Sequence, residues 1–203
     1  MKKLNVQKLV GIAMLAAVVV VLQFFANNIS FGGFSITLVL LPIVVGAVLY
    51  GPSAGSILGA VFGSVVVTGI LLFGPRDPLT AALWSANSIM TALVCILKGC
   101  AAGYISGVVF KLFLKFNTSS GSVIGSYAAA IICPIVNTGI FLIAMFTIFK
   151  PELITFAGGA NVVYFGLITL TGVNFLIELA VNIILAPVIV GIVNAIKGNR
   201  RKK

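Results

Sequence analysis

Residues 36–73 read ITLVLLPIVVGAVLYGPSAGSILGAVFGSVVVTGILLF, a run that contains no charged residue. A helix that crosses the roughly 30 Å hydrocarbon core of a bilayer needs about 20 mostly apolar residues, so this run approaches the length needed for two. Tyr50-Gly51-Pro52 lies near its middle and predicts a turn, because proline is favoured at the first position of a helix and cannot continue one. The run therefore predicts two consecutive membrane-spanning helices.

The rest of the chain has the same character. Of its 203 residues, 61% are hydrophobic and only 8% are charged. Soluble domains are about 45–50% apolar and about 25% charged, so the bilayer must be the solvent for this chain. We predict an all-α integral membrane protein with a single domain, residues 1–203, and six spans. The expected spans are approximately residues 9–25, 36–50, 53–73, 87–114, 123–149 and 166–196.

Prolines predict where the chain leaves the helices. Pro75 and Pro78 enclose Arg76 and Asp77, and this stretch is expected to be a loop. We expect a partly inserted loop carrying Trp84 to follow it, before the fourth span begins. Lys150-Pro151-Glu152 predicts the start of another loop, which leads to the sixth span.

The positive charges predict the topology. The chain has 13 Lys and Arg residues, and ten of them fall on the side shared by both termini. Arg76 and Lys150 lie on the other side. Because cytoplasmic loops carry an excess of Lys and Arg, both termini are expected in the cytoplasm. The remaining cation, Lys98, is left within the membrane, and the basic tail is interpreted as a topology signal and not as a nucleic-acid site.

The composition excludes several classes of function. The chain has no histidine, which excludes Ser-His catalysis and His-ligated metals. Its three acids, Asp77, Glu152 and Glu178, are far apart in sequence, which argues against a carboxylate metal site. No G-x-x-x-x-G-K-[ST] motif occurs, so the chain has no P-loop for ATP. We expect neither enzymatic activity nor a cofactor or metal.

Small residues recur at four-residue spacing on three of the predicted helices. Such ridges let helices approach closely in a membrane. The third and fourth spans are therefore expected to pack within the bundle, whereas the first span carries a weaker A-x-x-x-A ridge. The positions are Gly55, Gly59 and Gly63, then Gly99, Gly103 and Gly107, and finally Ala13 and Ala17.

Ionisable and amide side chains fall at one depth in three spans. At a rise of 1.5 Å per residue, Lys98, Asn137 and Glu178 each lie about 16–18 Å below the outer surface. Asn174 and Asn182 flank Glu178 at spacings of four and share its helical face. A polar stripe in lipid must face the protein interior or a cavity. Two interpretations stay open: a structural Lys98–Glu178 ion pair, or a site that a polar ligand completes.

Outer segments supply further candidates for ligand contact. Residues 27–35, 74–84 and 156–164 mix aromatic residues with glycine or asparagine, which suits closure over a small ligand. Trp84, Asn87, Asn161 and Tyr164 join Lys98, Asn137, Asn174 and Glu178 as candidate substrate contacts. The aromatic residues could equally anchor the protein at the membrane interface.

Taken together, these features resemble the substrate-binding S component of the energy-coupling factor (ECF) transporters. The resemblance rests on the six spans with both ends inside, the Ala13 and Ala17 pair, and a short second span that contains proline. It is most distinct in residues 36–63, 97–111 and 134–139, the last of which read PIVNTG.

The resemblance implies a multi-pass protein of the bacterial cell membrane that captures a water-soluble vitamin or related micronutrient from outside. A riboflavin-, pantothenate- or heterocycle-like substrate would fit. It also implies partners, namely a transmembrane coupling subunit that contacts Ala13 and Ala17 and two cytoplasmic ATPases. Two alternatives stay open: a stand-alone proton-coupled transporter that uses Glu178 and Lys98, and a structural membrane protein without a ligand.

Overall fold

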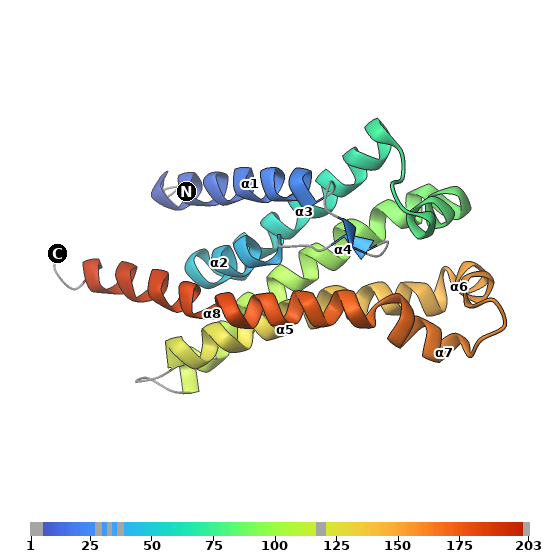
Figure 1. Ribbon diagram of the computed structural model, residues 1–203. Helices are drawn as coiled ribbons and strands as arrows, with labels where there is room; N and C mark the ends of the chain where they lie inside the picture. Colours follow the sequence, from blue (N-terminus) through green and yellow to red (C-terminus); the bar gives the residue numbers. More distant parts are fainter. Residues whose placement is uncertain (1–5, 27–29, 32–33, 36–38, 117–120, 201–203) are drawn as a thin grey trace.

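The computed structural model describes residues 6–26, 30–31, 34–35, 39–116 and 121–200, and these form a helical bundle with one small hairpin (Figure 1). The hairpin pairs two strands of two residues each in antiparallel register. Parts of the outer segment 27–35 and the start of the predicted second span, residues 36–38, lie outside the described residues. The elements are α1 (Val6–Ala26), β1 (Ser30–Phe31), β2 (Phe34–Ser35), α2 (Leu40–Tyr50), α3 (Pro52–Phe73), α4 (Pro78–Phe116), α5 (Gly121–Thr147), α6 (Lys150–Ala157), α7 (Val162–Tyr164), a π-helix (Phe165–Leu170) and α8 (Gly172–Arg200).

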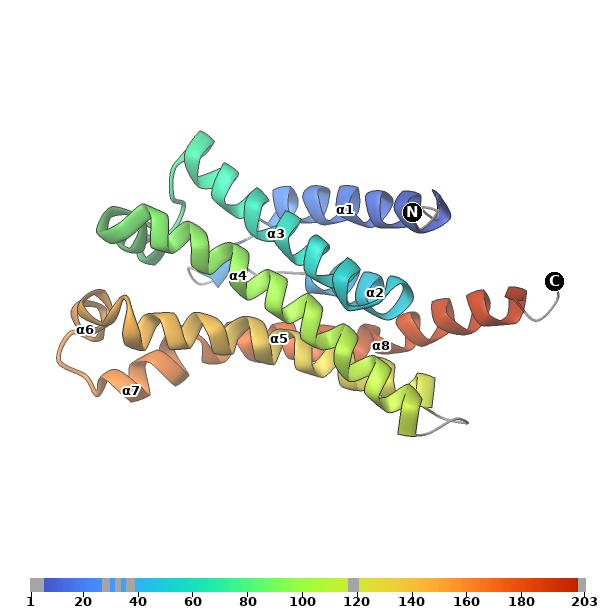
Figure 2. The same cartoon turned by 180° about the vertical axis from the view of Figure 1, so that it is seen from behind.

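Within the described residues, five helical segments are long and apolar enough to cross a membrane, and α2 is a shorter apolar helix. Its 11 residues extend only about 16 Å. Even so, the start of α1 and the end of α8 lie at the same end of the bundle (Figures 1 and 2). We call this the inner end, and we call the opposite end, with α6 and α7, the outer end. Lys8, Lys111 and Lys115 lie in the inner-end turns of α1 and α4; the cytoplasmic placement of this end stays a prediction.

Helices α3 and α4 cross in direct backbone contact, as their glycine ridges predicted. A Cβ atom added to Gly59 would meet the carbonyl group of Gly99, and one added to Gly55 would meet that of Gly103. The same holds one turn further out, where Gly63 faces the backbone of Cys95. We call this contact the glycine seam. It brings α4 against α3 on one side while α5 packs on the other (Figure 2).

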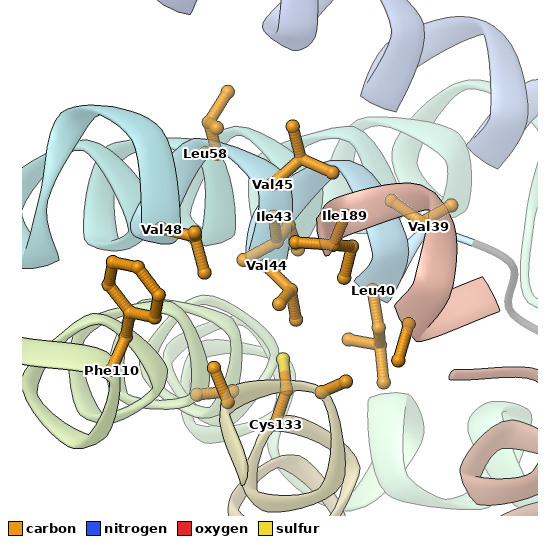
Figure 3. Packing of buried hydrophobic residues seen from close by; sticks show 14 of the residues in the cluster. Val39, Leu40, Ile43, Val44, Val45, Val48, Leu58, Phe110, Cys133 and Ile189 are labelled. Carbon is orange, nitrogen blue, oxygen red and sulfur yellow. The ribbon is translucent and has the colours of Figure 1, made fainter. Parts of the chain in front are cut away.

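The larger apolar cluster of the described residues lies where α2 meets α5 and α8, toward the inner end. Leu40, Ile43 and Val44 of α2 are fully buried, as is Ile189 of α8. Figure 3 shows the sulfur of Cys133 pointing from α5 into this cluster, which fits a thiol that acts as a small hydrophobic group. The inner half of the bundle is therefore closed by close apolar packing.

Two segments predicted as loops are helical. Pro78 begins α4, and the helix includes Trp84; the break comes at Asn87, whose backbone is extended at φ −158° and ψ 95°. Lys150 likewise begins the short helix α6, with Pro151 in its first turn. The loop predictions at Pro78 and Pro151 were wrong because proline is well suited to the first turn of a helix. The hydroxyl of Thr91 joins the two halves of α4 by donating to the carbonyls of Leu83 and Asn87, at 2.8 and 2.9 Å.

Candidate functional site

A cavity of about 400 Å³ opens within the outer half of the bundle. Its volume is within the range of roughly 300–1,000 Å³ that is typical of small-molecule sites. The walls come from α1, α3, both halves of α4, α5, α6, the π-helix and α8. The cavity thus lies beyond the apolar core, at the end of the bundle that carries α6 and α7.

The predicted polar layer lines this cavity. Lys98 of α4, Asn137 of α5, and Asn174 and Glu178 of α8 all contribute to its surface. Glu178 and Asn137 are only 3% and 6% exposed, so both polar groups are held away from bulk solvent. Three separate helices therefore contribute polar groups to one cavity. Their role as ligand contacts stays a prediction.

Hydrogen bonds fix part of this layer and leave some acceptors open. Nδ2 of Asn174 donates to Oε1 of Glu178 at 3.5 Å, and Nδ2 of Asn182 donates to the backbone carbonyl of Glu178 at 2.8 Å. The buried Oδ1 atoms of Asn137 and Asn174 accept no hydrogen bond from the described residues. Buried polar atoms are normally hydrogen-bonded, so these two oxygens are well placed to receive a donor from a ligand or a water molecule.

Aromatic rings form much of the cavity wall. Phe62, Phe141, Phe156 and Phe165 line it from four different elements. Nζ of Lys98 lies 5.3 Å from the centroid of the Phe141 ring, a cation–π distance. Phe141 follows Asn137 by one helical turn, so α5 presents an amide and a ring on the same side. Such walls suit a ligand with a flat apolar surface.

The π-helix contributes to the cavity wall. It is followed by its C-cap residue Thr171, whose hydroxyl donates to the carbonyls of Gly166 and Leu167, both at 3.1 Å. Its residues Phe165 and Leu170 and the adjoining Thr171 line the cavity. Because π-helical turns are rare and occur often at functional sites, this irregularity supports the assignment of the cavity as the binding site.

Arg76 and Asp77 also line the cavity. Asp77 caps the start of α4, since its carboxylate accepts from the backbone N–H and the hydroxyl of Thr80 at 2.8 and 2.7 Å. The guanidinium of Arg76 stands 5.5 Å from the Phe73 ring centroid. Residues 74–84 were expected to close over a ligand, but neither charge was chosen as a candidate contact, because charges are ordinary in loops.

The other four candidate contacts do not line this cavity in the described part of the chain. Trp84 is half-buried in the first half of α4, and Tyr164 is 62% exposed. Oδ1 of Asn87 caps the second half of α4 by accepting from the N–H of Met90 at 3.0 Å. Oδ1 of Asn161 caps α7 through the N–H groups of Val163 and Tyr164. The two asparagines therefore cap helices, a role for which asparagine is among the preferred residues.

Gln23 was missed for a different reason. It is 6% exposed and lines the cavity from the outer end of α1. As a polar residue in an apolar span it carried a detectable signal, but its depth did not match the layer of Lys98. Ala13 and Ala17 lie on the exposed side of α1, whereas Val19 faces the bundle. The small-residue pair is thus accessible from outside the bundle.

A helical bundle with five long apolar helices and a ligand-sized cavity at one end defines a multi-pass membrane protein of the binding or transport class. The family model described as ECF transporter, substrate-specific component, matches residues 7–190. The chain belongs to this family, and it is a non-catalytic transport subunit of an ECF transporter. No curated protein matches the chain at a significant level of sequence similarity.

Proposed function

We propose that the cavity captures a water-soluble vitamin or related micronutrient from outside the cell. The observation that carries this proposal is the enclosed polar layer of Lys98, Asn137 and Glu178 beneath aromatic walls. Ionisable groups inside a membrane are costly and are functional candidates by default. A buried ion pair alone is a poor stability device, because desolvation offsets most of its attraction. A riboflavin-, pantothenate- or heterocycle-like compound would fit this setting.

The bound compound is then delivered inward together with a transmembrane coupling subunit and two cytoplasmic ATPases. The exposed Ala13 and Ala17 on α1 supply the flat surface on which the coupling subunit would pack. This pair lies in the inner half of α1, away from the cavity-lining Gln23. Binding and coupling would therefore use separate parts of the molecule.

Replacing Ala13 and Ala17 together with Trp tests this separation. Transport by the assembled complex should be lost, because the bulky rings prevent close helix contact, while ligand affinity of the isolated subunit stays unchanged. Ala180, which is exposed on α8, is the matched control for an Ala→Trp change on a lipid-facing surface. If the double variant still transports at the normal rate, the coupling surface lies elsewhere.

Proteoliposomes separate this function from the stand-alone alternative. Uptake should require the ATPase-containing module and ATP, and a proton gradient alone should not drive it. Uptake by the purified chain under a proton gradient would favour a secondary transporter that titrates Glu178 and Lys98. A chain that binds no small molecule and supports no uptake would be a structural protein.

A further inference from the structure

We infer that the ligand is a planar nitrogen heterocycle without net charge that presents a lactam edge, a ring C=O beside a ring N–H. This inference rests on the proposed function and narrows its substrate class. Pantothenate-like and other anionic vitamins are thereby disfavoured. Three independent properties of the cavity lead to this conclusion: its balance of charge, its open hydrogen-bonding atoms and its aromatic walls.

The charges that line the cavity cancel. Lys98 and Arg76 contribute two positive charges, and Asp77 and Glu178 contribute two negative charges. Two of the three acids in the whole chain therefore lie on this one surface. Burying a ligand with a net charge here would leave one charge uncompensated in a setting of low dielectric, which is costly. A ligand without net charge keeps the balance.

The open polar atoms require both a donor and an acceptor on the ligand. The buried Oδ1 atoms of Asn137 and Asn174 can only accept, and they find no donor among the described residues. The ammonium group of Lys98 can only donate, and it reaches the cavity from α4. A lactam places an N–H and a C=O on neighbouring ring atoms, so one short edge can satisfy both kinds of group.

The walls favour a flat ring over a flexible chain. Phe141, Phe156 and Phe165 border the cavity, and the ammonium of Lys98 lies over the Phe141 ring. Aromatic rings stack on planar ligands and add affinity beyond the area that they bury. A ring against these walls also loses little conformational freedom on binding, in contrast to a flexible acyclic vitamin.

Native mass spectrometry of the full chain, purified in mild detergent, gives the first test. We expect a retained small molecule whose accurate mass and fragmentation identify a neutral heterocycle with a lactam group. A retained anionic or acyclic compound overturns this inference but leaves the proposed function intact. If no molecule is retained, thermal shifts with added compounds decide the matter, because a ligand stabilises the state that it binds.

The added compounds form two groups. Riboflavin, xanthine, hypoxanthine and uracil carry a lactam edge, whereas pantothenate and nicotinate are anions without such an edge. At least one lactam compound should stabilise the protein, and its lactam N-methyl derivative should bind at least tenfold more weakly. A phosphorylated form of the same compound should also bind more weakly. Stronger stabilisation by an anionic compound, or unchanged affinity after N-methylation, overturns the inference. No binding in either assay contradicts the proposed function as well.

A variant of Lys98 tests whether its ammonium group binds the C=O of the lactam. Lys98→Gln removes the ammonium group that reaches the cavity from α4 and should weaken binding of the best lactam compound at least tenfold. Lys150→Gln changes a lysine that is exposed at the start of α6, and it should leave the affinity unchanged. If both variants bind like the original protein, Lys98 does not contact the ligand and the proposed edge is wrong.

Discussion

The glycine seam and the cavity are neighbouring parts of the same helices, yet they are built on opposite principles. At the seam, Gly59 of α3 and Gly99 of α4 bring two backbones together with no room for a side chain. About two and three turns further out along α3, Val66 and Ile70 line the open cavity. The same pair of helices is therefore closed in one half and separated in the other.

The difference shows how a membrane protein can keep an open site without losing its fold. In lipid, helices associate through close packing and not through the hydrophobic effect. The seam supplies this packing and leaves the outer half free to hold polar groups such as Asn137 that have unsatisfied atoms. Stability and binding should consequently respond to different substitutions.

The largest expected effect is at the seam. Gly59→Leu places a side chain against the backbone of Gly99 and should lower the free energy of unfolding by about 3 kcal/mol or more. Thermal unfolding in detergent measures the loss. Gly139→Ala on α5 is the control, because a Cβ atom there meets nothing within 4 Å and the change should be neutral or stabilising. Equal melting temperatures for the two variants would show that the seam is not a main source of stability.

The seam was also the part that the sequence predicted best. A four-residue repeat of glycine favours close packing of helices in lipid, so the spacing predicted that both helices pack within the bundle. The structure adds that the two ridges meet each other, with Gly55 against Gly103. The short length of α2 and the helical start of α4 at Pro78 were harder to predict from the sequence. Hydropathy reports that a segment is buried in lipid or protein, but it does not distinguish an inserted loop from a helix.

At the cavity, the strongest expected effect is on affinity. Glu178→Gln keeps the shape of the side chain but removes the charge, and it should weaken ligand binding by about tenfold to a hundredfold if the carboxylate accepts a ligand N–H. Calorimetric titration measures it. Glu152→Gln in α6 is the matched control, since Glu152 does not line the cavity in the described part of the chain.

The Glu178→Gln variant also distinguishes a structural role of Glu178 from a ligand-binding role. If Glu178 only balances Lys98, the substitution should lower the melting temperature and leave ligand affinity unchanged. If Glu178 binds the ligand, the substitution should lower ligand affinity. The two measurements together therefore decide between the structural ion pair and the ligand site.

The sequence predicted the candidate site only at polar residues that lie within apolar spanning helices. Lys98 and Glu178 stand out because charges are rare in spanning helices, whereas Phe141 and Phe165 resemble any other apolar residue. Arg76 and Asp77 were ambiguous, because charges are ordinary in loops. Asn87 and Asn161 cap helices, and asparagine serves helix caps as readily as ligands, so their assignment as ligand contacts stays a prediction.

A smaller effect is expected from substitution of Asn137, which should raise the stability of the ligand-free protein and lower its affinity for the ligand. Asn137→Leu removes a buried oxygen that has no donor among the described residues. Without ligand, the variant should gain about 1 kcal/mol of stability, because the unsatisfied group no longer has to be buried. Ligand affinity should fall at the same time. Asn137→Asp is a useful comparison, since it keeps an acceptor but adds a charge and should not stabilise. A destabilised Asn137→Leu variant would mean that the amide holds the helices together.

The smallest effect is expected at Asn87, where α4 bends at the outer end. Asn87→Ala removes the cap on the Met90 N–H and should cost about 1 kcal/mol of stability. Ligand affinity should not change, because the exposed Asn87 side chain lies outside the cavity in the described residues. Asn87→Ser retains a capping oxygen and should restore most of the melting temperature. If Asn87→Ala instead weakens binding at an unchanged melting temperature, the residue contacts the ligand and the outer half of the site extends beyond the cavity seen here.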